Sequence, residues 1–153
     1  MNRHSILYGN DPAKNDGSRL SRGQRVFCSD RGGRGGCGKT FSIFLANVLP
    51  RHTAHASVVS RLLIELLANA CVKTAVQNLR LPFPLETIYH LLQRLRRRLP
   101  EIRCRLCRRQ KEPHSSQSDP LGHSVEHLQA VFPASLCPVS DFQLSFQHPF
   151  LGN

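Results

Sequence analysis

A glycine-rich stretch, GGRGGCGKT, occupies residues 32–40 and contains the residue types that bind phosphate groups. Gly33, four further residues and then Gly38, Lys39 and Thr40 follow the spacing of a phosphate-binding loop. In such a loop the backbone N–H groups approach the phosphates, the lysine neutralises them and the threonine holds magnesium. The pattern makes a nucleotide-binding protein one hypothesis. The apolar run before the loop is short, so a flexible basic loop that follows a phosphate backbone is the competing interpretation.

Two cysteines and two histidines later in the chain have a spacing that suits zinc. Cys104 and Cys107 are separated by two residues, and His123 and His127 follow after fifteen residues and are separated by three. Thiolates and imidazoles in this arrangement are the ligands of a two-cysteine, two-histidine zinc site. A zinc-binding interaction module is therefore a second hypothesis, with zinc as its cofactor. Free thiols and solvated histidines are the alternative, because the residues between the pairs include no phenylalanine, tyrosine or tryptophan and one leucine, Leu121, with which to build a finger core.

Arginines gather at the end of an amphipathic segment, residues 85–99, whose leucines and isoleucine recur every three or four residues. This spacing predicts a helix with one apolar face. The side chains that we expect to contact DNA from this helix are Thr87, Tyr89, His90, Gln93, Arg94, Arg96, Arg97 and Arg98. The uncharged ones suit base edges, and the guanidinium groups suit phosphates. A helical hairpin with a solvated basic face is the alternative interpretation.

Three predicted helices position these side chains. Residues 56–70 form a leucine-rich amphipathic segment, and residues 72–80 form a shorter one. The sequence LPFP at 81–84 then interrupts the pattern, because a residue that precedes proline is disfavoured in helical geometry. A short helix joined by a tight turn to a third helix is the arrangement that places a helix in the major groove of DNA.

The charge distribution favours a polyanionic partner. The chain has 21 lysines and arginines against 10 acidic residues, a net charge of +11. Residues 1–52 hold nine basic and three acidic side chains, residues 53–110 hold eleven and three, and residues 111–153 hold one and four. We therefore expect nucleic acid to bind before residue 110.

The same composition bears on location in the cell. No apolar run reaches the length of a membrane span, and the first ten residues lack the apolar core of a secretory signal. We expect a cytoplasmic protein, associated with the nucleoid if it binds DNA, that has no membrane partner. Its six cysteines are then free thiols or metal ligands rather than a disulfide framework.

The strings CGKTF at 37–41 and TIYHLLQRL at 87–95, with RVFC before them, carry a family resemblance. Residues 25–99, approximately, resemble the amino-terminal zinc-ribbon plus helix-turn-helix region of bacterial insertion-sequence transposases and their short accessory proteins. The resemblance implies DNA binding, with a transposase or a second copy of the chain as a protein partner. It also implies that Cys37 ends the second cysteine pair of a ribbon. The partner position falls on Cys28, with eight residues between the two cysteines instead of two, and no first pair lies upstream.

We therefore expect a mainly α protein with a small helix-turn-helix-like core, a short N-terminal ribbon or loop and irregular tails. The expected segments are a flexible arm at 1–24, a degenerate zinc-ribbon-like segment at 25–52, a helical domain at 53–110 and an acidic tail at 111–153. The tail is predicted to hold a short helix and a strand, the latter because Phe142, Leu144 and Phe146 alternate with polar residues.

No catalytic constellation accompanies these elements. Insertion-sequence transposases place a metal-holding acidic triad in a large domain after the helices, and the 54 residues after Leu99, with five acidic residues, are too few for one. We expect no enzyme activity and no small-molecule substrate. The resulting hypothesis is a non-catalytic protein that binds duplex DNA and is related to mobile elements. The nucleotide-binding and zinc-binding hypotheses remain alternatives, as does a decayed element without a selected function.

Overall fold

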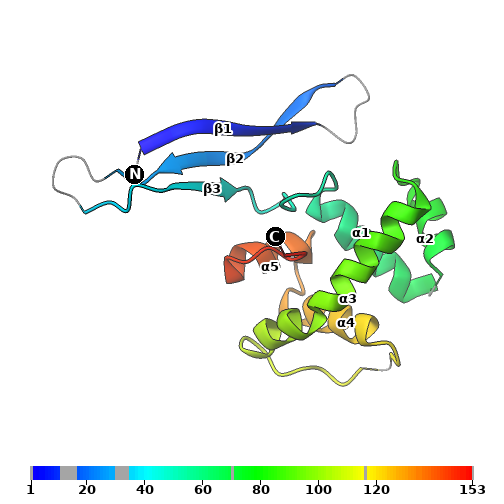
Figure 1. Cartoon of the computed structure of the whole chain (residues 1–153). Helices are drawn as coiled ribbons and strands as arrows, with labels where there is room; N and C mark the ends of the chain where they lie inside the picture. Colours follow the sequence, from blue (N-terminus) through cyan, green and yellow to red (C-terminus); the bar gives the residue numbers. More distant parts are fainter. Residues whose placement is uncertain (1, 11–16, 30–34, 70, 116, 153) are drawn as a thin grey trace.

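The computed structural model describes residues 2–10, 17–29, 35–69, 71–115 and 117–152. Within these residues a three-stranded sheet lies to one side of a group of five helices (Figure 1). The strands are β1 (Asn2–Asn10), β2 (Arg19–Phe27) and β3 (Thr40–Phe44). The helices are α1 (Ala56–Asn69), α2 (Val72–Leu79), α3 (Leu85–Cys107), α4 (Pro120–Val131) and α5 (Pro138–Phe146). The fold is therefore mixed α and β. The expected helical core is present, but the expectation of a mainly α protein did not include the three-stranded sheet.

The first two strands lie where the sequence predicted a flexible arm. β1 and β2 pair antiparallel, and β3 pairs antiparallel with the other edge of β2. Three arginines interrupt the apolar residues of β2, so the alternation that signals a strand is weak there. Backbone hydrogen bonds between neighbouring strands form whatever the side chains are, and they order these residues. The segment at 25–52 accordingly contains the end of β2, a hairpin loop and β3.

The three predicted helices are present as α1, α2 and α3, and the third is longer than predicted. α3 continues through Pro100 to Cys107. Proline inside a helix removes one backbone hydrogen bond and costs roughly 3 kcal/mol. Ile102 and Leu106 are buried and extend the apolar stripe of Leu95 and Leu99 by two further turns. Burial of this stripe outweighs the cost of the proline.

The strand predicted near the end of the chain is a helix instead. α5 begins at Pro138, whose fixed φ suits the first position of a helix. Phe142 and Phe146 are four residues apart, so they share a helix face, and their rings lie 4.8 Å apart. Phe150 packs edge-on against Phe142 at 5.2 Å. The alternating pattern was ambiguous because residues four apart coincide in both periods, and the aromatic cluster selects the helix.

One hydrophobic core joins the helices. α1 contacts α2, α4 and α5, and α3 packs mainly against α4. The largest fully buried side chains of this core include Leu49, Leu62, Ile88, Leu95 and Phe142. None of the helices in the described part of the chain combines the length and the apolar character that crossing a bilayer requires.

Two side chains fix the segment between β3 and α1. The amide nitrogen of Gln143 donates hydrogen bonds to the carbonyl oxygens of Ala46 at 2.6 Å and Val48 at 2.9 Å. Arg22 of β2 donates from Nη2 to the carbonyl oxygens of Leu49 and His52. The segment is thus held from the helices on one side and from the sheet on the other.

Candidate nucleic-acid interface

A sharp bend separates α2 from α3, as the sequence predicted. Arg80 ends α2 in the left-handed conformation, with φ 48° and ψ 47°. The backbone N–H of Leu81 then bonds to the carbonyl oxygen of Val76 at 3.3 Å, which closes the helix end. Residues 82 and 83 form a bend, and Pro84, with ψ 145°, is extended before α3 begins at Leu85.

Polar side chains of α3 line a groove beside the start of α1. The groove has a volume of about 350 Å³, and its base is apolar, with Val59, Leu62, Ile88 and Leu91. Its polar lining consists of His52, Thr53, Thr87, His90, Gln93, Arg94 and Arg97, and we call this surface the α3 groove. Five of the eight side chains predicted to contact DNA therefore lie together. Their spacing along α3 puts them on one side of the helix.

The positive charge of the α3 groove comes from two arginines. Arg94 donates from Nη1 to Nε2 of His52 at 3.2 Å. Burial lowers the pKa of His52, and the neighbouring charges of Arg94 and Arg22 lower it further, so this ring is neutral at neutral pH. In the described part of the chain neither Arg94 nor Arg97 has a carboxylate within ion-pair distance. Both guanidinium groups are available to an anionic ligand.

Three of the predicted contacts lie outside the α3 groove. Tyr89 is 52% exposed on the adjoining face of the helix. Arg96 lies 4.0 Å from a carboxylate oxygen of Asp119, and both side chains are more than half exposed. Arg98 is paired with Glu101. The arginine cluster of the sequence is thus divided between a groove, a surface ion pair and an intramolecular network.

Glu101 is the centre of that network. It accepts a hydrogen bond from Arg105 at 3.0 Å and is paired with Arg98. Nε2 of His148 lies 2.7 Å from Glu101 and 2.7 Å from Arg98, and it can serve only one of them at a time. Burial lowers the pKa of His148, so its unprotonated nitrogen accepts from Arg98 at neutral pH. Arg98 therefore joins α3 to the residues after α5.

Replacing Glu101 with glutamine is expected to flatten the acid side of the pH–stability curve. The hydrogen bond from Arg105, with the charge of Arg98, lowers the pKa of Glu101 below its usual 4.5. A carboxyl of this kind adds stability above its unfolded-state pKa and loses it as the pH falls through the folded-state value. Thermal unfolding followed by circular dichroism, in steps from about pH 6 down to about pH 3, measures the slope. The exposed Glu86 supplies the control substitution; equal slopes in the two variants would contradict the prediction.

The predicted phosphate-binding loop is a β-hairpin loop. Gly33 lies outside the described residues. Gly38 has φ 66°, its N–H bonds to the carbonyl oxygen of Cys28, and the N–H of Cys28 bonds to the carbonyl oxygen of Lys39, each at 2.9 Å. This is the hydrogen-bond pattern of a β-bulge with glycine at its left-handed position. Thr40 then begins strand β3, so no helix N-terminus faces the loop, and the phosphate-binding geometry is absent from these residues.

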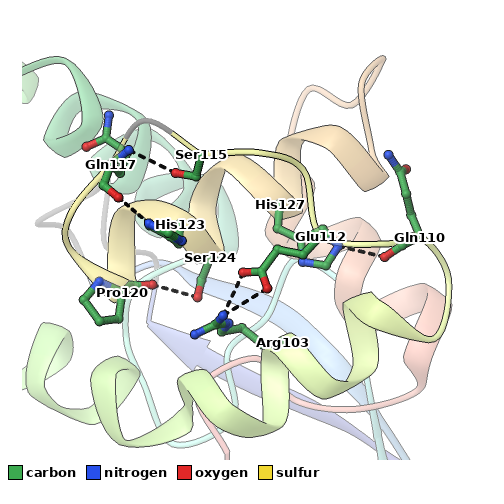
Figure 2. A network of polar contacts seen from close by, with 9 residues as sticks. All are labelled: Arg103, Gln110, Glu112, Ser115, Gln117, Pro120, His123, Ser124 and His127. Atoms are coloured by element: carbon green, nitrogen blue, oxygen red, sulfur yellow. Dashed lines mark hydrogen bonds and ion pairs between the residues drawn. The ribbon is translucent and has the colours of Figure 1, made fainter.

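The structure separates the residues predicted to bind zinc, which are Cys104, Cys107, His123 and His127. Both thiols are exposed on α3. The imidazoles lie on α4, where Nε2 of His123 and Nε2 of His127 contact the backbone carbonyl oxygens of Gln117 and Gln110, the second at 2.9 Å (Figure 2). His127 is completely buried. Among the residues that the structure describes, no three histidine, cysteine or acidic side chains are placed to hold a metal ion.

The same neighbourhood fixes the chain after α3. Arg103 donates to both carboxylate oxygens of Glu112, at 2.8 and 3.0 Å (Figure 2). The hydrogen bonds from Arg103 lower the pKa of Glu112. The acidic segment therefore neutralises basic residues of α3 that lie away from the α3 groove.

Sequence reasoning missed the contribution of the segment before α1. His52 and Thr53 reach the α3 groove because Arg22 and Gln143 hold this segment in place. No motif marks these residues in the sequence.

The chain was compared with models of protein families, with curated proteins and with solved structures, and none of them matches.

Proposed function

We propose that the protein binds duplex DNA through the α3 groove. The observation that supports this proposal is the gathering of Thr87, His90, Gln93, Arg94 and Arg97 on one surface. Among the residues that the structure describes, no carboxylate lies within ion-pair distance of the two guanidinium groups. The surface belongs to the part of the chain that carries eleven basic and three acidic side chains. A phosphate backbone is the ligand that such a surface attracts most strongly.

In the proposed binding mode, different residues of α3 contact the phosphates and the bases. Arg94 and Arg97 contact phosphates, which fixes the position of the helix on the duplex. Thr87, His90 and Gln93 lie nearer the start of α3, and they contact base edges in the major groove. The exposure of Thr87, His90 and Gln93 supports this mode.

The connection with mobile elements is part of the proposal and is supported by the resemblance of residues 25–99 alone. In this setting the protein is a non-catalytic accessory or transposase-derived protein. Its protein partner is a transposase or a second copy of the chain.

Replacing Arg94 and Arg97 together with alanine is expected to weaken duplex binding by about ten- to a hundredfold, because each arginine supplies a charge-assisted hydrogen bond to a phosphate. The slope of log affinity against log salt concentration should fall by roughly 0.9 for each phosphate that the variant no longer binds. Fluorescence anisotropy with a labelled random duplex of about 20 base pairs, measured over a salt series, gives both quantities.

The matched control removes the same charge from α3 outside the groove. Arg96 and Arg108 are both exposed, and neither lines the α3 groove. Their double replacement with alanine should change affinity and salt slope much less. Equal reductions in the two double variants would show a diffuse attraction and would reject the groove as the binding site.

A further inference from the structure

Two cysteines lie beside each other at the base of the β2–β3 hairpin. Cys28 follows β2 directly, and Cys37 lies three residues before β3. The backbone N–H of Cys37 donates a hydrogen bond to Sγ of Cys28 at 3.4 Å. The Cys28 thiol is therefore turned toward the backbone of Cys37, across the loop.

The β-bulge holds this arrangement in place. Cys28 uses its own N–H and its carbonyl oxygen, each at 2.9 Å, to bind Lys39 and Gly38 on the opposite strand. Cys37 directly precedes Gly38, so it lies next to the residue that Cys28 pairs with. The 3.4 Å contact between Sγ of Cys28 and the backbone nitrogen of Cys37 places that sulfur beside Cys37, and a disulfide joins residues whose Cα atoms lie about 4.4–6.8 Å apart. Rotation of the two side chains is then the movement that brings the sulfur atoms together, and the hairpin hydrogen bonds remain.

Both thiols are reduced in the structure, and their exposure differs. Cys37 is exposed, whereas Cys28 is half-buried. An oxidant from solvent therefore meets Cys37 first, and Cys28 is placed as the resolving thiol. This division of roles is the one that intramolecular thiol–disulfide exchange requires.

We propose that Cys28 and Cys37 are a reversible disulfide site for low-molecular-weight disulfides such as oxidised glutathione. The Cys37 thiolate attacks one sulfur of the oxidant, which breaks its S–S bond, releases one glutathione thiol and leaves a mixed disulfide. The Cys28 thiolate then attacks the Cys37 sulfur and releases the second glutathione. The protein loses two electrons and two protons, and the oxidant gains them. This inference is independent of the proposed DNA binding.

Disulfide formation closes the eight residues between the two cysteines into a covalent loop. This loop carries two arginines, Arg31 and Arg34, in its sequence.

Arg31 and Arg34 are trypsin cleavage sites between the two cysteines, so digestion tests for the disulfide. The folded protein is equilibrated with oxidised glutathione, its remaining thiols are alkylated under denaturing conditions, and it is digested with trypsin without reductant. Cleavage at Arg25, Arg31, Arg34 and Lys39 separates the fragments VFCSDR (26–31) and GGCGK (35–39), so only a disulfide keeps them together. The expected product is the joined pair, which dithiothreitol splits. Recovery of both fragments with alkylated cysteines, or of either one joined to glutathione or to another cysteine, would overturn the proposal.

Two controls test the contribution of the fold. A synthetic peptide that covers residues 26–39 should need about tenfold more oxidised glutathione for half-oxidation, because the hairpin raises the effective concentration of one thiol near the other. Equal requirements would mean that the geometry contributes nothing. The variant with Cys104 and Cys107 replaced by serine should give the same joined fragments as the native chain, and their absence would assign the reactivity to α3 instead.

Discussion

Replacement of Phe142 with alanine is expected to lower the free energy of unfolding by about 3–5 kcal/mol. Phe142 is completely buried, and its ring contacts Phe146 and Phe150. Alanine removes the buried ring and leaves a cavity that α5 cannot close, because Phe150 is fixed by its own backbone bond to Gln143. Urea unfolding followed by circular dichroism at 222 nm, roughly the helix minimum, measures the decrease.

Leu144 provides the control on the same helix. Its side chain is 60% exposed, so its replacement with alanine should change the free energy of unfolding by less than about 0.5 kcal/mol. The pair also separates the two interpretations of the sequence 142–146. In a strand both residues would face the same side, and the two substitutions would have similar effects. Similar effects would therefore contradict the helix.

Replacement of Gln143 with leucine is expected to lower the free energy of unfolding by about 3 kcal/mol. Leucine fills a similar volume but leaves three backbone groups, two buried and one half-buried, without the partner that Gln143 supplies. They are the carbonyl oxygens of Ala46 and Val48 and the N–H of Phe150, which Gln143 binds at 2.6, 2.9 and 3.0 Å. A buried backbone group without a partner costs about 1–3 kcal/mol, reduced where water can reach it.

Hydrogen exchange makes this second prediction specific. The amide hydrogen of Phe150 should exchange faster in the Gln143→Leu variant, because its acceptor is gone. The control is Gln147→Leu, which removes an exposed side chain whose amide donates to the carbonyl oxygen of Leu144 in the preceding turn. That variant should keep both its stability and the protection of Phe150. A Gln143→Leu variant with unchanged stability would show that the three backbone groups find other partners.

The helical part of the fold is predictable because its signals are local. The leucines of α1 and the proline pair after α2 act within a few residues of themselves, and the helices begin and end close to the expected positions. The strands are less predictable because β1 and β2 depend on each other's backbone. The predicted end of α3, at Leu99 before Pro100, was too early. The helix continues to Cys107 because it packs against α4, a contact that the local sequence does not reveal.

The candidate site divides in the same way. Thr87, His90, Gln93, Arg94 and Arg97 could be grouped from the sequence because one helix carries them. The separation of Arg96 and Arg98 from this group could not, because Asp119, Glu101 and His148 become their neighbours only in the folded chain. The glycine loop could not be interpreted from its sequence either. It would suit phosphate binding if Thr40 began a helix, but Thr40 begins strand β3.

Arg22 joins the sheet to one edge of the α3 groove through hydrogen bonds. The guanidinium group of Arg22 extends from β2 and donates hydrogen bonds to the carbonyl oxygens of Leu49 and His52. His52 is one of the residues that line the α3 groove. A displacement of β2 relative to the helices would therefore have to break these two hydrogen bonds or move His52 as well. The N–H of Leu45, which bonds to the carbonyl oxygen of Arg22 at 3.0 Å, adds a backbone link between the same parts. The position of the sheet thus bears on the shape of the groove, although the sheet supplies none of the residues that line it.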